Sequence, residues 1–185
     1  MRENDIPKEF YSFETNAPFE RCIECEKYLL DDETEYIIEK AVKNYEGYAA
    51  KDTVFDYAIC MDCAEHMRKK ISKESWSSMM RYFQENMDIE RRLEMQHKHP
   101  EENLKSCMIK KTQIDDCREY QIYAHCKGGR LNMDNPPYLI SGEVMEELIP
   151  LLSDKTIDDM NGFLNKHFSP DPSLMEPTPP RLILV

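Results

Sequence analysis

Alternating apolar residues predict strands in the first third of the chain. In TVFDYAIC, residues 53–60, the side chains of Phe55, Tyr57 and Ile59 fall on one face, which is the period-two pattern of a half-buried strand. Residues 35–45 carry apolar side chains at spacings that fit either a strand or a helix. We expect a strand over 35–39, then a short helix or an extended arm.

Apolar residues at helical spacing predict two helices in the middle of the chain. Residues 62–70 read as a helix start, and the longest helix is expected over 75–97, ending before Pro100. Because methionine commonly fills irregular cores, we interpret the apolar stripe of this helix as core and not as a partner groove. The stripe comprises Trp76, Met79, Met80, Phe83 and Met87.

The last third of the chain combines a predicted hairpin with two helices. Residues 118–133 alternate in polarity around Gly128 and Gly129, which predicts a β-hairpin with a glycine turn. Helices are expected from 142 to about 152 and from about 156 to 168. Their boundary signals are Ser141 as an N-cap, Pro150 as a helix end, and Thr156 with Asp159 as a capping box.

The charge of the chain bears on its partners. The 185 residues carry a net charge of −12, and residues 1–63 hold 7 Lys and Arg against 16 Asp and Glu. Nucleic-acid binding needs basic side chains that displace counterions from phosphate, so this balance argues against it. The one basic cluster comprises Arg68, Lys69 and Lys70, which we interpret as a solvated helix face.

The composition also bears on the compartment. No stretch approaches the roughly 20 apolar residues of a membrane helix, and the first residues lack the apolar core of a signal peptide. We therefore expect a cytoplasmic protein with no membrane contact. The seven cysteines are an odd number, and a reducing cytosol disfavours disulfides, so metal binding is the better explanation for paired cysteines.

Two CxxC pairs carry the clearest chemical signal. Cys22 and Cys25 form the first pair, and Cys60 and Cys63 form the second, at the junction of a predicted strand and a predicted helix start. Zn²⁺ prefers thiolate ligands in tetrahedral sets of four, and a helix N-terminus stabilises bound thiolate. The spacing therefore predicts one structural Zn²⁺ bound by these four cysteines.

This arrangement resembles the treble-clef and zinc-ribbon families of zinc-binding domains over about residues 19–70. In treble clefs, a knuckle supplies one cysteine pair and the first turn of a helix supplies the other. The resemblance implies that Cys22 and Cys25 form the knuckle and that Cys60 and Cys63 come from the helix start. The common knuckle has glycine just after its second cysteine, where this chain has Glu26.

A thiol-redox site is the competing interpretation of the second pair. A strand that leads into CxxC at a helix start also resembles the active site of thioredoxins, which would add a tryptophan before the first cysteine and a proline within the pair. This chain has Ile59 before Cys60, with Met61 and Asp62 between the cysteines. Redox chemistry would also leave the first pair unexplained, so we favour zinc.

The remaining cysteines leave one question open. Cys107, Cys117 and Cys126, with a histidine, are a weak candidate for a second metal site, because their spacing is irregular. His125 and Cys126 should point to opposite faces of a strand and therefore not share a metal. No internal repeat is visible along the chain.

These observations together predict an α+β fold. It would comprise a treble-clef-like zinc module over 1–70, a connecting long helix over 71–99, a small α+β region over 100–168 with a hairpin and two helices, and a proline-rich tail over 169–185. We expect a zinc-binding adaptor or regulator that acts through protein contacts, with the acidic first region and the tail as contact surfaces. The alternatives are a thiol-redox or zinc-dependent enzyme and a nucleic-acid-binding zinc module.

Overall fold

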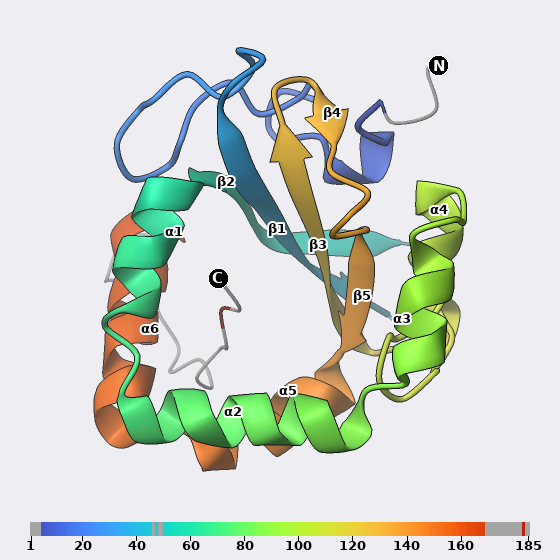
Figure 1. Cartoon of the computed structure of the whole chain (residues 1–185), viewed down its shortest axis with the longest axis vertical. Helices are drawn as coiled ribbons and strands as arrows, with labels where there is room; N and C mark the ends of the chain where they lie inside the picture. The colour runs from blue at the N-terminus through green and yellow to red at the C-terminus, as the bar shows by residue number, and fades with distance from the viewer. Residues whose placement is uncertain (1–4, 46, 48–49, 169–182, 184–185) are drawn as a thin grey trace.

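An antiparallel sheet forms the centre of the molecule (Figure 1). The computed structural model describes residues 5–45, 47, 50–168 and 183. Within them the sheet has five strands in the order β2-β1-β3-β4, and β5 pairs with β3 beside β4. The strands are β1 (Glu35–Asn44), β2 (Lys51–Cys60), β3 (Glu119–Lys127), β4 (Arg130–Leu131) and β5 (Tyr138–Ser141).

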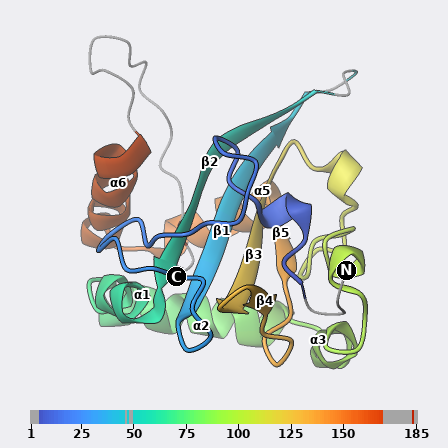
Figure 2. The ribbon, with the colours of Figure 1, turned by 90° about the horizontal axis from the view of Figure 1, so that it is seen from above.

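Helices border the sheet along three sides in the view of Figure 1, and Figure 2 shows the same arrangement from above. α1 and α6 lie on one side, α2 and α5 cross below, and α3 and α4 lie on the other side. The described helices are α1 (Met61–Arg68), α2 (Lys73–Asn86), α3 (Ile89–Met95), α4 (Pro100–Asn103), α5 (Gly142–Leu148) and α6 (Asp154–Phe168). Short 3₁₀ turns cover η1 (Lys8–Phe10), η2 (Ile114–Asp116) and η3 (Ile149–Leu151).

The predicted α+β class is confirmed, but the predicted order of elements differs at several points. Residues 35–44 form one continuous strand with no helix, because β1 pairs along its length with β2 on one side and with β3 on the other. The helix expected over 75–97 is two helices, α2 and α3. The chain is extended at Met87, and the side chain of Asp88 caps α3 by accepting a hydrogen bond from the Arg91 N–H (3.0 Å).

The C-terminal boundaries also differ from those expected. The predicted hairpin gains a third strand, β5, whose last residue Ser141 makes no side-chain cap to α5. The cap of α6 is Ser153, whose Oγ accepts from the Thr156 N–H (3.3 Å), so the helix begins earlier than Thr156. Pro150 ends α5 as expected, because the chain tightens into η3 there.

The middle of the sheet is buried on both faces. On one face, the carboxylate of Glu39 in β1 accepts hydrogen bonds from the hydroxyls of Tyr57 in β2 (2.6 Å) and Tyr123 in β3 (3.3 Å). Phe163 of α6 packs on Tyr57 with the ring centres 5.2 Å apart. Burial raises the pKa of Tyr57 and of Tyr123, so both hydroxyls stay protonated and act as donors.

One sheet joins the first 70 residues to residues 100–168. β1 pairs with β3 from Glu35 opposite Lys127 to Lys43 opposite Glu119. The predicted tail lies outside the described residues, apart from Ile183, which is buried.

Candidate metal centre

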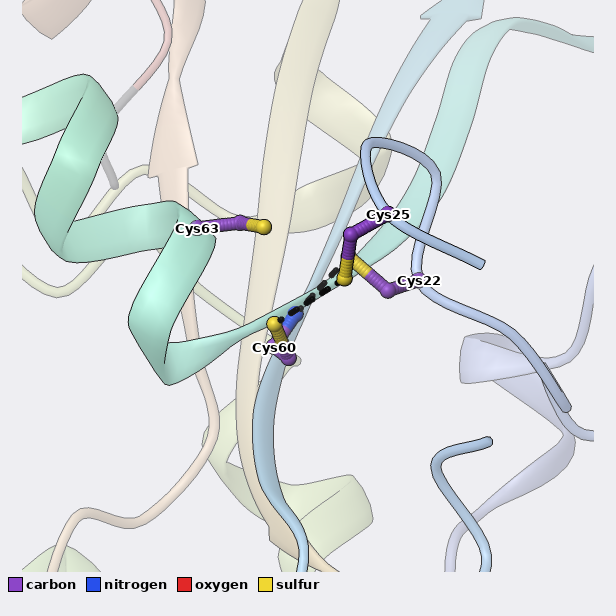
Figure 3. Close-up of side chains that lie close together, drawn as sticks. All are labelled: Cys22, Cys25, Cys60 and Cys63. Carbon is purple, nitrogen blue, oxygen red and sulfur yellow. Dashed lines mark hydrogen bonds between the residues drawn. The ribbon is translucent and has the colours of Figure 1, made fainter. Parts of the chain in front are cut away.

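The two CxxC pairs predicted to share a metal meet at one end of the sheet. Their four sulfur atoms all lie within 4.8 Å of one another. Figure 3 shows Cys22 and Cys25 on the loop that precedes β1, Cys60 at the end of β2 and Cys63 on the first turn of α1, with the side chains converging. The structure therefore brings together all four residues that the spacing selected.

The donor atoms and their separation fit a single metal ion. Zinc–thiolate bonds of about 2.3 Å in a tetrahedron place neighbouring sulfur atoms roughly 3.8 Å apart. The Sγ atoms of Cys25 and Cys60 are 3.7 Å apart, and no pair in the cluster exceeds 4.8 Å. The cluster is therefore consistent with one bound metal ion.

A tight turn over residues 21–28 presents the first pair. Arg21 and Tyr28 form an antiparallel bridge, the Cys22 N–H donates to the Lys27 carbonyl (2.9 Å), and the Glu26 N–H donates to the Cys22 carbonyl (3.0 Å). Glu26 has a φ of 59°, the left-handed conformation that glycine adopts without steric cost. The knuckle turn thus forms although glutamate occupies the glycine position.

The second pair lies where β2 becomes α1. Cys60 is the N-cap residue of α1, and its backbone N–H donates to the Sγ of Cys22 (3.4 Å). The Ile23 N–H donates to the Ala58 carbonyl (2.9 Å), which fixes the knuckle against β2. These backbone bonds set the distance between the two pairs.

Burial divides the four thiols. Cys22 and Cys60 are buried, Cys63 is half-buried and Cys25 is exposed. Burial raises the pKa of the Cys60 and Cys63 thiols, whereas a backbone hydrogen bond from Lys27 lowers the pKa of Cys25. A metal ion binds thiolates, so it would take the place of the protons that burial favours.

Glu24, between the two knuckle cysteines, has a role that sequence reasoning missed. Its carboxylate is bonded to Nε2 of His167 (2.7 Å) and accepts from Nζ of Lys166 (2.9 Å), which ties the knuckle to the end of α6. Burial acts to raise the pKa of Glu24, but these hydrogen bonds outweigh it and lower the pKa. The partners are more than 140 residues away in sequence, and no local pattern marks the pair.

The question that the sequence left open, whether the other three cysteines form a second metal site, is answered by their positions. In the described part of the chain, the four-cysteine cluster is the one group of three or more metal-ligating side chains. Cys107, Cys117 and Cys126 are all buried, and they lie in different surroundings. The Cys107 sulfur accepts from the Ser141 N–H (3.3 Å), Cys117 donates to the Gln113 carbonyl, and Cys126 lies beside Tyr36.

The basic cluster lies at the end of α1. The guanidinium of Arg68 lies over the ring of Trp76, 5.8 Å from its centre, and Lys69 pairs with Glu65 (3.3 Å). Part of its charge is therefore already engaged within the chain.

Comparison with known proteins adds no family assignment. No family model matches the chain, and no curated protein or solved structure matches it either. No helix among the described residues is long and apolar enough to cross a bilayer.

Proposed function

We propose that the chain is a zinc-binding adaptor or regulator in which one structural Zn²⁺ is held by Cys22, Cys25, Cys60 and Cys63. The observation that carries the proposal is the convergence of four thiols, and no other kind of side chain, within 4.8 Å. Four protein ligands complete a tetrahedral shell, which leaves no position for a substrate or a reactive water. The metal would therefore act on folding and not on chemistry.

The zinc would add a strong link between two parts of the chain that backbone hydrogen bonds already bring together. The knuckle belongs to the segment before β1, whereas Cys60 and Cys63 belong to the corner between β2 and α1. Metal binding in small zinc domains contributes on the order of 10 kcal/mol to folding. The cytoplasmic placement belongs to the same proposal, because a reducing compartment keeps such cysteines available as ligands.

The adaptor role rests on apolar side chains exposed on α3. Ile89 and Leu93 lie four residues apart on one face of this helix and are 69% and 55% exposed. An amphipathic helix with an exposed apolar pair can insert into a groove of a partner protein. The charge of the first 63 residues favours a basic or neutral partner surface and disfavours nucleic acid.

Metal content per chain, measured with a count of reactive thiols, tests the zinc site. We expect one zinc per chain in protein purified without added metal, with the four cluster thiols protected until a chelator is added. Protein without metal, whose thiols oxidise in pairs, would overturn the proposal and support the thiol-redox alternative. Cys25 would then be the attacking thiol, since it is exposed and 3.7 Å from Cys60.

The adaptor role needs its own experiment. Replacing Ile89 and Leu93 with aspartate should abolish partner capture while leaving zinc content unchanged. The matched control replaces Phe13, which is equally exposed but lies in the segment before β1, with aspartate. Equal capture by both variants and the unchanged protein would remove α3 from the proposal. Salt-sensitive binding to DNA or RNA, lost when Arg68, Lys69 and Lys70 are neutralised, would instead support the nucleic-acid alternative.

A further inference from the structure

A second turn in the chain has the backbone hydrogen bonds of the cysteine knuckle. Ser106 and Gln113 form an antiparallel bridge, as Arg21 and Tyr28 do. Within this turn the Cys107 N–H donates to the Thr112 carbonyl (2.8 Å), and the Lys111 N–H donates to the Cys107 carbonyl (3.0 Å). Lys111 has a φ of 63°, against 59° for Glu26. The matching residues are Cys22 and Cys107, Glu26 and Lys111, and Lys27 and Thr112.

Both turns are attached in the same way to the corner between a strand and a helix. The Ile23 N–H donates to Ala58, two residues before the end of β2, and the Met108 N–H donates to Leu139 (2.8 Å), two residues before the end of β5. The last residue of each strand then donates its N–H to the cysteine of the turn. These bonds are Cys60 N–H to Cys22 Sγ (3.4 Å) and Ser141 N–H to Cys107 Sγ (3.3 Å).

The strands that follow each turn repeat both register and sequence. β1 pairs with β2 so that Tyr36 is opposite Cys60, and β3 pairs with β5 so that Tyr120 is opposite Ser141. The chain reads EYII over 35–38 and EYQI over 119–122, then YAIC over 57–60 and YLIS over 138–141. A helix starts directly after each second strand, α1 after β2 and α5 after β5.

A second helix then follows in each case, and the two helix starts form reciprocal bonds. Ser72 caps α2 and Ser153 caps α6, each through its Oγ to the N–H three residues on. The Ser72 N–H donates to Thr156 Oγ1 (3.1 Å), and the Ser153 N–H donates to Ser75 Oγ (2.8 Å). This exchange is what a two-fold relation between two copies of one unit produces.

The second helices also pack on the opposite copy. Phe163 of α6 contacts Tyr57 of β2, whereas the Tyr82 hydroxyl of α2 donates to Glu147 of α5 (2.5 Å). Recurrence of an isolated turn would explain the two cysteine turns, but it would not explain matched strand registers, matched caps and exchanged helices.

We propose that the chain is a tandem duplication of one treble-clef unit, with a first unit over 20–86 and a second unit over 105–168, and that the second unit retains a degenerate metal site. Its four ligand positions are Cys107, Lys110, Ser141 and Val144, which correspond to Cys22, Cys25, Cys60 and Cys63. One ligand of four remains. The expectation of no internal repeat is revised, because the matched hydrogen bonds and registers connect short sequence matches that spacing alone did not mark.

An ion pair joins the parts of the second unit that a metal would join in the first. Nζ of Lys110, at the second knuckle position, bonds to Oε1 of Glu147 on α5 (2.5 Å), and Tyr82 bonds to the other carboxylate oxygen. The link runs from knuckle to helix, as the cysteine cluster does between the knuckle and α1. In the second unit a part-exposed ion pair therefore joins the knuckle to the helix, where the first unit has its cysteine cluster.

Restoring the ligands tests the proposal. In the full chain, Lys110→Cys, Ser141→Cys and Val144→Cys together complete a four-cysteine set with Cys107. We expect bound zinc to rise by one ion per chain relative to the unchanged protein, and a Co²⁺ titration to show an added thiolate charge-transfer band. The matched control carries the same three changes plus Cys107→Ser and should lose this gain or bind at least tenfold more weakly.

Two results would overturn the proposal. One is a folded triple variant, with an unchanged circular dichroism spectrum, that gains no metal. The other is a gain that persists unchanged with Cys107→Ser. If the triple variant does not fold, Lys110→Cys with Ser141→Cys keeps the buried Val144 and supplies three thiolates. Co²⁺ should then bind with a weaker thiolate band, and its failure to bind would reject the site. The test of the second site measures the zinc that the triple variant binds beyond what the unchanged protein binds. If the first site binds no zinc, the unchanged protein itself will contain none, so the two failures can be told apart.

Discussion

The two units attach the same knuckle turn to a strand–helix corner with different side chains. Each places a knuckle turn against the corner between a strand and a helix, and each uses the same backbone bonds to do so. In the first unit four thiols converge at that corner. In the second unit the buried Cys107 is the one cysteine at the four matching positions, and Lys110 with Glu147 makes the connection. The difference indicates that this backbone geometry does not require a cluster of four cysteines.

The sharpest test of the comparison replaces matched cysteines. Cys60→Ser should remove the metal from the first unit and lower the free energy of unfolding by about 3 kcal/mol or more, because bound zinc contributes to folding. Cys107→Ser should cost only about 1–2 kcal/mol, since it alters packing around one buried thiol. Urea unfolding with and without a chelator measures both. Equal losses that the chelator does not change would break the comparison.

The reciprocal helix caps should give intermediate effects. Ser72→Ala and Ser153→Ala should each cost about 1 kcal/mol, because each serine accepts a hydrogen bond from the third N–H of its helix. Both hydroxyls belong to one network with Ser75 and Thr156, so the double variant should cost less than the sum. Thermal unfolding of the two single variants and the double variant, compared with the unchanged protein, measures the coupling between the two caps as a double-mutant cycle. Full additivity would mean that the two caps act independently.

The two units should lose their stabilising contacts at different pH values. The Lys110 bond holds the pKa of Glu147 below its usual 4.5. The pair therefore contributes stability above about pH 4.5 that is lost as the pH falls through the lower folded value. Lys110→Met should destabilise by less than about 1 kcal/mol at neutral pH, because the pair is part-exposed, and the difference from the unchanged protein should vanish in acid.

Metal release from the first unit should occur at a higher pH than the loss of this pair, because protons compete directly for thiolates. A pH series that follows both bound metal and unfolding checks the order. The control is Lys98→Met, which removes an exposed ion pair between Lys98 and Glu94 of α3, outside both units. It should change neither the pH of metal release nor the pH at which the Lys110 contribution is lost. Simultaneous loss of metal and of the Lys110 contribution would contradict the separation.

Glycine at the two left-handed positions should give the smallest effect and the opposite sign. Glu26→Gly and Lys111→Gly each relieve a residue held at positive φ, which should stabilise the protein by about 0.5 kcal/mol after the entropy of glycine is subtracted. Asn16→Gly, also at positive φ but outside both knuckles, is the matched reference. Destabilisation by either knuckle substitution would show that the side chain matters more than the backbone conformation there.

The sequence by itself determined the parts of this protein that depend on local spacing. The two CxxC pairs identify four thiols that meet, and the alternation of Phe55, Tyr57 and Ile59 identifies β2. Local patterns did not decide the element boundaries where a helical spacing and a helix-start signal overlap. Helical spacing continued through residue 88, but the side chain of Asp88 starts a new helix there.

Only the tertiary structure decided how the two units combine and that they are related. β1 could be read as strand or helix until its pairing with both β2 and β3 settled it. The repeat is carried mainly by backbone hydrogen bonds, which different side chains can make equally well. Lys110, Ser141 and Val144 occupy ligand positions without resembling ligands, so only their place in the fold reveals them. Side-chain spacing records local chemistry, whereas pairing across the sheet depends on contacts distant in sequence.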